Sequence, residues 1–182
     1  DKDNIPTEVY TALVENVNNN LDSFHRYLKL KKRMLGVDTL KYSDLYAPVV
    51  KGIELEYDYD EAKKLVIEAV RPLGKSYLRT VEKALENRWV DVHPTPGKRA
   101  GAYSNGSAYD VHPYILLNYN GQYDDVSTLA HELGHAMHSY YSNKAQPYPT
   151  ADYSIFVAEV ASTFNEALLI DKMLKEIKDD DV

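Results

Sequence analysis

The spacing of apolar residues predicts one long amphipathic helix from about residue 6 to residue 35. Pro6 suits a first helical turn, and Gly36 suits the position just beyond the last turn. Apolar side chains recur along this segment at intervals of three, four or seven residues, which places them in one stripe: Leu13, Val17, Leu21, Phe24, Leu28 and Leu35. We expect this stripe to serve packing.

A second helical pattern begins near Asp60, which suits an N-cap, and runs through Val70. Pro72 and Gly74 interrupt it, because proline removes a backbone donor and glycine favours a break. The pattern then resumes to about Asn87. We therefore expect two helical segments separated by a short break.

Residues 88–123 are rich in glycine and proline, which is typical of strands and turns. The segment 112–119 predicts a short strand, followed by a turn at Asn120 and Gly121. Pro113 near its start favours an edge strand over a central one. Two more helices are predicted, at about 124–141 and 153–177. The fold class is therefore mainly α (α+β), with a small sheet.

Composition narrows the classes of function. Of the 182 residues, 44% are hydrophobic and 27% charged, which is typical of a globular protein with one core. The formal net charge of -7 argues against a nucleic-acid partner. The absence of cysteine excludes disulfides and thiolate metal sites, so a metal ion must be held by His, Asp or Glu.

The same sequence predicts no association with a membrane, since no apolar stretch approaches the roughly 18 residues that a span needs. Residues 1–4 lack the basic and apolar regions of a signal peptide, which favours the cytoplasm. Because the chain starts without Met, a leader removed from the chain stays an open alternative.

The predicted helix 124–141 contains the motif His131-Glu132-Leu133-Gly134-His135. With His131 set at 0° on a helical wheel, His135 lies near 40° and Glu132 near 100°. The opposite face, from about 140° to 260°, is apolar. It comprises Val126, Leu129, Ala130, Leu133, Ala136, Met137 and Tyr140. The pattern predicts a helix with a buried back and a histidine-bearing front.

This arrangement has a specific chemical use. Side chains four residues apart on a helix lie about 6 Å from one another, so two imidazole nitrogens can bind one Zn²⁺ at about 2.1 Å. Glu132, on the flank, can take the proton of a water molecule bound there and so act as general base. Gly134 is expected to leave the helix surface open beside the metal. The alternative is a purely structural His–Glu–His set.

Hydrolytic zinc sites usually have three protein ligands. His138 lies on the same face but about 10 Å of helix rise from His131. We therefore interpret it as a residue that supports the ligands or the structure and does not bind the metal itself. The other candidates are Asp152, Glu159 and Glu166 of the next helix. Glu159 is the first choice, because a lone carboxylate in the apolar run 155–161 is costly unless it is paired or binds a metal. Glu166 is a candidate to orient a ligand imidazole.

Several segments together resemble the thimet oligopeptidase and oligoendopeptidase F family of zinc peptidases. They are the zinc helix at 131–135, the third-ligand helix at 156–166, the loop at 97–104, the strand at 112–121 and part of the first helix at 25–28. The resemblance spans nearly the whole chain. It implies a helical zincin-like catalytic domain that holds one Zn²⁺ per chain on His131, His135 and Glu159.

The same resemblance implies an enzyme that cleaves internal bonds of short peptides. In related zinc peptidases, an edge strand beside the cleft pairs with the substrate backbone. Here that role would fall to the residues of the predicted strand: Tyr114, Ile115, Leu116, Leu117, Asn118 and Tyr119. An ordinary core strand is the alternative for this segment.

The family extends beyond both ends of this chain, so residues 1–182 are expected to be a single region within a larger metallopeptidase catalytic domain. In the family, the segment that follows the region resembled here carries a histidine and tyrosines that stabilise the tetrahedral intermediate, and the resemblance implies that residues 1–182 do not include it. Two other functions stay open: a zinc exopeptidase on a similar scaffold and a non-catalytic zinc-containing peptide-binding domain. The sequence does not indicate the oligomeric state.

Overall fold

The computed structural model describes residues 4–49 and 56–176, and these ranges form two compact units. Each unit is described by itself. The elements are mostly helices, accompanied by a three-stranded sheet, so the predicted fold class is confirmed. That residues 1–182 belong to a single region of a larger catalytic domain stays a prediction.

The first unit contains two helices where the sequence predicted one. They are α1 (Thr7–Asn19) and α2 (Leu21–Leu35), followed by the 3-10 turn η1 (Tyr42–Tyr46). The break lies at Asn20, whose side-chain amide donates to the carbonyl of Asn16 at 2.7 Å. Such local bonds compete with the regular helical pattern. As predicted, α2 ends at Gly36, with a φ of 66°.

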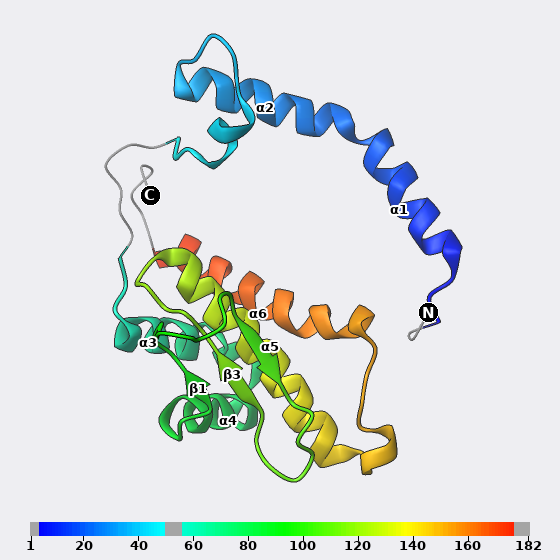
Figure 1. Cartoon of the computed structure of the whole chain (residues 1–182), viewed down its shortest axis with the longest axis vertical. Helices are drawn as coiled ribbons and strands as arrows, with labels where there is room; N and C mark the ends of the chain where they lie inside the picture. Colours follow the sequence, from blue (N-terminus) through cyan, green and yellow to red (C-terminus); the bar gives the residue numbers. More distant parts are fainter. Residues whose placement is uncertain (1–3, 50–55, 177–182) are drawn as a thin grey trace. The chain divides into compact units, whose positions relative to one another are not determined.

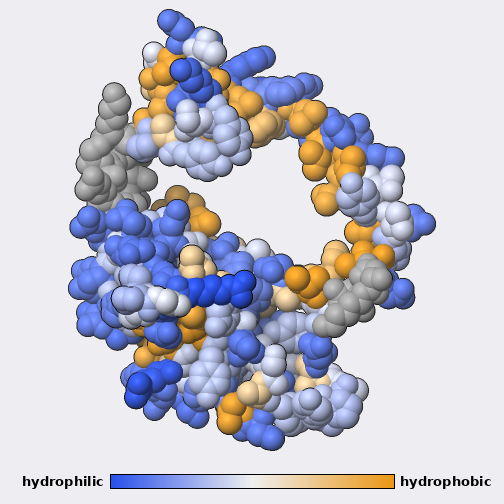
Figure 2. Space-filling model, in the orientation of Figure 1, coloured by the Kyte–Doolittle hydropathy of each residue, from blue (hydrophilic) through white to orange (hydrophobic). Residues whose placement is uncertain are grey.

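The apolar stripe of this unit is exposed within the described residues. Leu13, Val17 and Phe24 are 62%, 56% and 52% exposed. Hydrophobic surface is visible along the two helices in Figure 2. The expectation that the stripe packs against a core is therefore not met inside the part of the chain that the structure describes.

The second unit opens with α3 (Tyr59–Ala69). Its N-cap is Asp58 rather than the predicted Asp60, because Asp58 and Glu61 form a capping box. The Asp58 carboxylate accepts from the backbone of Glu61 at 2.8 Å, and the Glu61 carboxylate accepts from the backbone of Asp58 at 3.0 Å. The break predicted at Pro72 and Gly74 is confirmed. It contains the 3-10 turn η2 (Arg71–Leu73) and separates α3 from α4 (Lys75–Glu86).

The sheet contains β1 (Val90–Asp91), β2 (Tyr103–Asn105) and β3 (Tyr114–Leu116), in the order β1-β3-β2. Strand β3 pairs in parallel with β1 and antiparallel with β2. The prediction of an edge strand at 112–119 is therefore wrong. Pro113 is compatible with a central strand because it precedes the ladder, where its missing N–H breaks no strand–strand hydrogen bond.

Helices α5 (Tyr123–Ala145) and α6 (Ile155–Glu176) complete the unit, with the 3-10 turn η3 (Tyr148–Thr150) between them. Both helices were predicted, although the expected end at residue 177 lies outside the described residues. In Figure 1, α5 lies between the strands and the other helices of the unit. None of the described helices combines the length and apolar character needed to cross a membrane.

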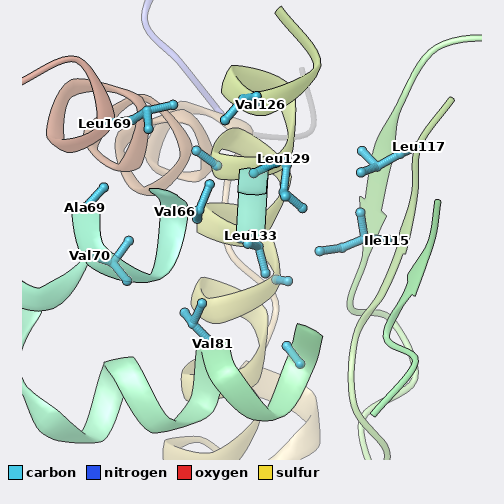
Figure 3. Packing of buried hydrophobic residues seen from close by; sticks show 14 of the residues in the cluster. Val66, Ala69, Val70, Val81, Ile115, Leu117, Val126, Leu129, Leu133 and Leu169 are labelled. Carbon is cyan, nitrogen blue, oxygen red and sulfur yellow. The ribbon is translucent and has the colours of Figure 1, made fainter. Parts of the chain in front are cut away.

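The core forms around the predicted back of α5. Leu129 and Leu133 are fully buried, between Val66 and Val81 of the helices on one side and Ile115 of the sheet on the other (Figure 3). Almost the whole predicted back is buried, whereas Tyr140 is only partly so. Because this back is fixed on two sides, the opposite face of α5 is held rigidly.

Candidate metal centre

His131 and His135 lie one turn apart on α5 and direct their rings to the same point. The two Nε2 atoms are 3.1 Å apart, and the side chains are 25% and 18% exposed. This convergence follows from the helical spacing, because residues i and i+4 share one face. Burial lowers the pKa of His135 below its ordinary value, which favours the neutral, metal-binding form of the ring.

Glu159 of α6 brings a carboxylate to the same point. Its Oε2 lies 3.5 Å from Nε2 of His131 and 3.5 Å from Nε2 of His135. Ligand atoms at about 2.0–2.2 Å from a tetrahedral Zn²⁺ are separated from one another by about 3.3–3.6 Å. The two separations of 3.5 Å lie in this range and the third, at 3.1 Å, is 0.2 Å shorter, so the three atoms are placed close to the arrangement that one such ion needs. Asp152 does not belong to this group, within the described part of the chain.

The exposure of Glu159 differs from the expectation. Its side chain is 52% exposed, and the neighbouring Phe156 and Val160 are 63% and 64% exposed. The apolar run therefore does not surround the carboxylate, because α6 buries a different face, which carries Ser162, Asn165, Leu169 and Met173. Ser162, on that buried face, donates its hydroxyl to Oε2 of Glu159 at 2.8 Å and so fixes the carboxylate.

Gly134 has a different role from the predicted one. It is buried under α6 instead of leaving the helix surface open. An ideal Cβ at this position would lie 2.6 Å from the carbonyl oxygen of Ala161 and 2.6 Å from Cα of Ser162. No real side chain tolerates such contacts with backbone, so only glycine allows this approach. The closeness of the two helices is what brings Glu159 to the histidines.

Glu166 lies about two turns beyond Glu159 on α6 and contacts the other side of the His131 ring. Its Oε1 is 2.6 Å from Nδ1 of His131. A carboxylate only accepts, so Nδ1 carries the proton and Nε2 keeps its lone pair. The ring of His135 is likewise hydrogen-bonded to the backbone of Ala158. Two imine nitrogens and one carboxylate oxygen thus converge, and such a set of acceptors requires a cation or a proton between them.

Glu132 is the most buried acid of the site, with 7% of its surface exposed. The backbone of Ser104 donates a hydrogen bond to its carboxylate, while Oε2 has no partner among the described residues. Burial raises the pKa of Glu132 above its ordinary value. With His131 and Glu166, it lines a cavity of about 370 Å³. A buried carboxylate with one oxygen unused is suited to accept a proton there.

His138 lies outside this group. Its ring stacks on Tyr153, with centroids 3.7 Å apart, and burial lowers its pKa. The hydroxyl of Tyr153 is in turn 2.6 Å from that of Ser139. This stack connects α5 to the segment just before α6, which agrees with the interpretation of His138 as structural.

The residues predicted to pair with a substrate, 114–119, include the central strand of the sheet. Strand β3 has neighbours on both sides, so its backbone is already paired. The amide of Asn118 donates to the carbonyls of Arg99 and Gly101, and the buried Tyr119 donates its hydroxyl to Tyr57. These contacts hold the sheet together, and the backbone of Tyr114–Leu116 is not open to a further strand. A contact between residues 114–119 and a substrate stays a prediction.

Strand β2 takes the position at the edge of the sheet, with no partner on its other side among the described residues. Its residues line a cavity of about 760 Å³ together with His135 and Glu159. From sequence, Tyr103 and Ser104 were expected to lie in the loop at 97–104. The alternation of exposed and half-buried residues in β2 is too short to identify a strand.

Comparison with known proteins identifies the family of this chain. A sequence profile described as Peptidase family M3 matches residues 1–181. The chain belongs to this family. Oligopeptidase PepF of Bacillus subtilis is 49% identical over 97% of this chain and 26% of its own length. Group B oligopeptidase PepB of Streptococcus agalactiae is 47% identical over 97% of this chain and 29% of its own length.

Solved structures of M3-like peptidases agree with this placement. A Chlamydophila abortus protein described as a peptidase has a TM-score of 0.82 and 46% identity, over 98% of this chain and 30% of its own. Oligoendopeptidase-F from Enterococcus faecium has a TM-score of 0.57 and 30% identity, over 98% of this chain and 23% of its own. The predicted resemblance is confirmed. This M3 chain spans about a quarter to a third of the relatives' length.

Proposed function

We propose that this chain provides the metal ligands and the general base of a zinc endopeptidase that hydrolyses internal bonds of short peptides. The observation that carries the proposal is the convergence of three ligand atoms, 3.1 to 3.5 Å apart, beside the buried carboxylate of Glu132. Two imidazoles and one carboxylate suit Zn²⁺, one ion per chain. Zinc in such a site polarises a peptide carbonyl and lowers the pKa of a bound water.

The protein side chains have distinct tasks in this proposal. Glu132 accepts a proton from the attacking water on its carboxylate, which lines the same cavity as His131, and it returns that proton to the leaving amine. Its burial strengthens this role, because a desolvated carboxylate is a stronger base. Glu166 keeps the proton of His131 on Nδ1, so that Nε2 faces His135 and Glu159.

The substrate class is inferred from the relatives, which are named oligopeptidases and oligoendopeptidases. In the complete gene product that contains these residues, a peptide of about ten residues blocked at both ends should be cleaved at an internal bond. Cleavage should require about one Zn²⁺ per chain. Mass spectrometry of the products, beside elemental analysis of the protein, makes both measurements.

Different outcomes would support the alternatives. Cleavage of peptides with free ends but not of blocked ones would identify an exopeptidase. A zinc-loaded protein that binds peptides and cleaves none, at any length tried, would identify a peptide-binding domain. A well-folded protein that retains no zinc after supplementation would contradict the proposed metal centre itself.

We also propose that the peptide backbone adds to the sheet along β2 (Tyr103–Asn105). This edge strand lines the same cavity as His135 and Glu159, and an edge strand offers backbone groups to an extended peptide. The N–H of Ser104 is not among them, because it bonds Glu132, so the pairing would use backbone carbonyls of β2 as acceptors. The substrate would then lie across the face that carries the ligand atoms.

This pairing is testable with depsipeptides. Replacing one amide next to the scissile bond by an ester removes a backbone donor, and we expect kcat/KM to fall about tenfold, which corresponds to one hydrogen bond of about 1.4 kcal/mol. The same replacement near the end of the peptide serves as control and should have little effect. Equal kcat/KM values for all ester positions would contradict backbone pairing at β2.

A further inference from the structure

The side chain of Asn165 joins three helices behind the metal centre. Asn165 lies on α6 and is 1% exposed. Its Nδ2 donates to the backbone carbonyl of Ala130 on α5 at 3.1 Å, and its Oδ1 accepts from the hydroxyl of Tyr77 on α4 at 3.0 Å. A buried amide with both ends paired has a single orientation, so it fixes the groups that it contacts.

The chemistry of the partners determines this orientation. The carbonyl of Ala130 can only accept, so the amide nitrogen of Asn165 must face it. The amide oxygen then faces Tyr77, whose hydroxyl must donate. Burial raises the pKa of Tyr77 to about 12, so this hydroxyl keeps its proton. No exchange of the amide oxygen and nitrogen satisfies both partners.

Asn165 and Glu166 are consecutive on α6, and their partners Ala130 and His131 are consecutive on α5. Asn165 bonds the backbone of the first, while Glu166 contacts the ring of the second at 2.6 Å. We propose that Asn165 is a positioning residue, which sets the register of α6 on α5 so that Glu166 holds the ring of His131. The inference rests on the proposed function, since it concerns how the metal ligands are oriented.

The contact of Gly134 with the backbone at Ser162 sets how near the helices lie. The two bonds of Asn165 add a directional constraint along the helix axis to that close packing. A slide by a single residue moves a side chain by about 1.5 Å along the axis. Such a displacement would break the contact between Glu166 and His131. The directional bonds of Asn165 oppose it.

The test is the substitution Asn165→Leu in the complete gene product. Leucine has the same branched shape, although it is bulkier, and it cannot bond Ala130 or Tyr77. We expect the affinity for Zn²⁺, measured by competition with a chelator, to fall about 10- to 100-fold, as is usual when a second-sphere partner is lost. We also expect kcat to fall more than KM changes, because the site that reacts is disturbed more than the peptide contacts.

A matched control separates positioning from stability. Val66 is fully buried on α3 and contacts no polar group of the site, so Val66→Ala should lower the midpoint of unfolding of the metal-free protein. It should leave the zinc affinity of the folded protein unchanged. Both variants lose stability, but only Asn165→Leu should lose zinc affinity.

A second variant keeps the inference testable if Asn165→Leu does not fold. Tyr77→Phe removes only the hydroxyl that orients the amide, and we expect zinc affinity to fall about three- to tenfold, in keeping with the loss of one neutral hydrogen bond. Zinc affinity within twofold of the unmodified protein, in every folded variant of Asn165 or Tyr77, would overturn the inference. A failure of the unmodified protein to bind zinc would instead contradict the proposed function.

Discussion

Replacing Glu132 by Gln is expected to reduce peptide hydrolysis by a factor of about 10² to 10⁴ while zinc remains bound. Glutamine has the shape of glutamate and can fill the same buried position, but its amide cannot take a proton from water. Glu132 is not among the three residues whose ligand atoms converge, so the ion should stay in place. The rate and the zinc content, measured on one preparation, test this.

The control for this variant is Glu86→Gln. Glu86 is exposed at the end of α4, outside the group of converging ligands, so the same change of charge there should alter kcat/KM by less than twofold. If the Glu132 variant retained most of the activity, another group would have to remove the proton, and the role given to Glu132 would be wrong.

The part of the site that follows from local helical geometry was predictable from sequence. A period of 3.6 residues is enough to place His131 and His135 on one face and Leu129 and Leu133 on the other, and the structure has them so. This works because the residues lie on one uninterrupted helix. The apolar face of the helix, opposite the histidines, is then buried by whichever neighbouring elements pack against it.

Contacts between distant segments were not predictable in the same way. The edge position belongs to β2 because residues 103–105 pair with 114–116, and a pairing between segments leaves no periodic signal in either one. The bond from Ser104 to Glu132 depends on that pairing as well. A single short strand pattern therefore could not distinguish a central strand from an edge strand.

Gly134 and Glu159 illustrate a second limit. From sequence, a glycine beside a metal ligand indicates open space, whereas here it marks the point at which α6 approaches α5 most closely. The apolar run around Glu159 indicates burial, but α6 buries Ser162 and Asn165 and exposes Phe156. Which face of a helix is buried depends on its neighbour, and here the neighbour's glycine lies against the backbone at Ala161 and Ser162.

The crossing of α5 and α6 is consequently the element on which the proposed site depends. One helix supplies His131, His135 and Glu132, and the other supplies Glu159 and Glu166. Both carboxylates contact His131, from opposite sides of its ring. A metal ion bound there would connect the two helices, so binding of the ion should stabilise the folded protein.

Replacing His135 by Ala is expected to weaken zinc binding at least about a hundredfold, which corresponds to about 2.7 kcal/mol. The loss of one of three ligands removes both a bond and the convergence that His131 and Glu159 share with it. Zinc at 100 times its dissociation constant stabilises a folded protein by about 2.7 kcal/mol. A chelator should therefore lower the unfolding temperature of the unmodified protein but not that of this variant.

His138→Ala is the matched control, because it removes the same side chain from the same helix one turn later. His138 stacks on Tyr153 and lies outside the converging group, so its loss should lower stability with or without metal. The chelator should then shift the unfolding temperature of this variant as much as that of the unmodified protein. If the two variants exchanged these behaviours, His138 would be a ligand in place of His135, and the assignment of the metal centre would have to move one turn along α5.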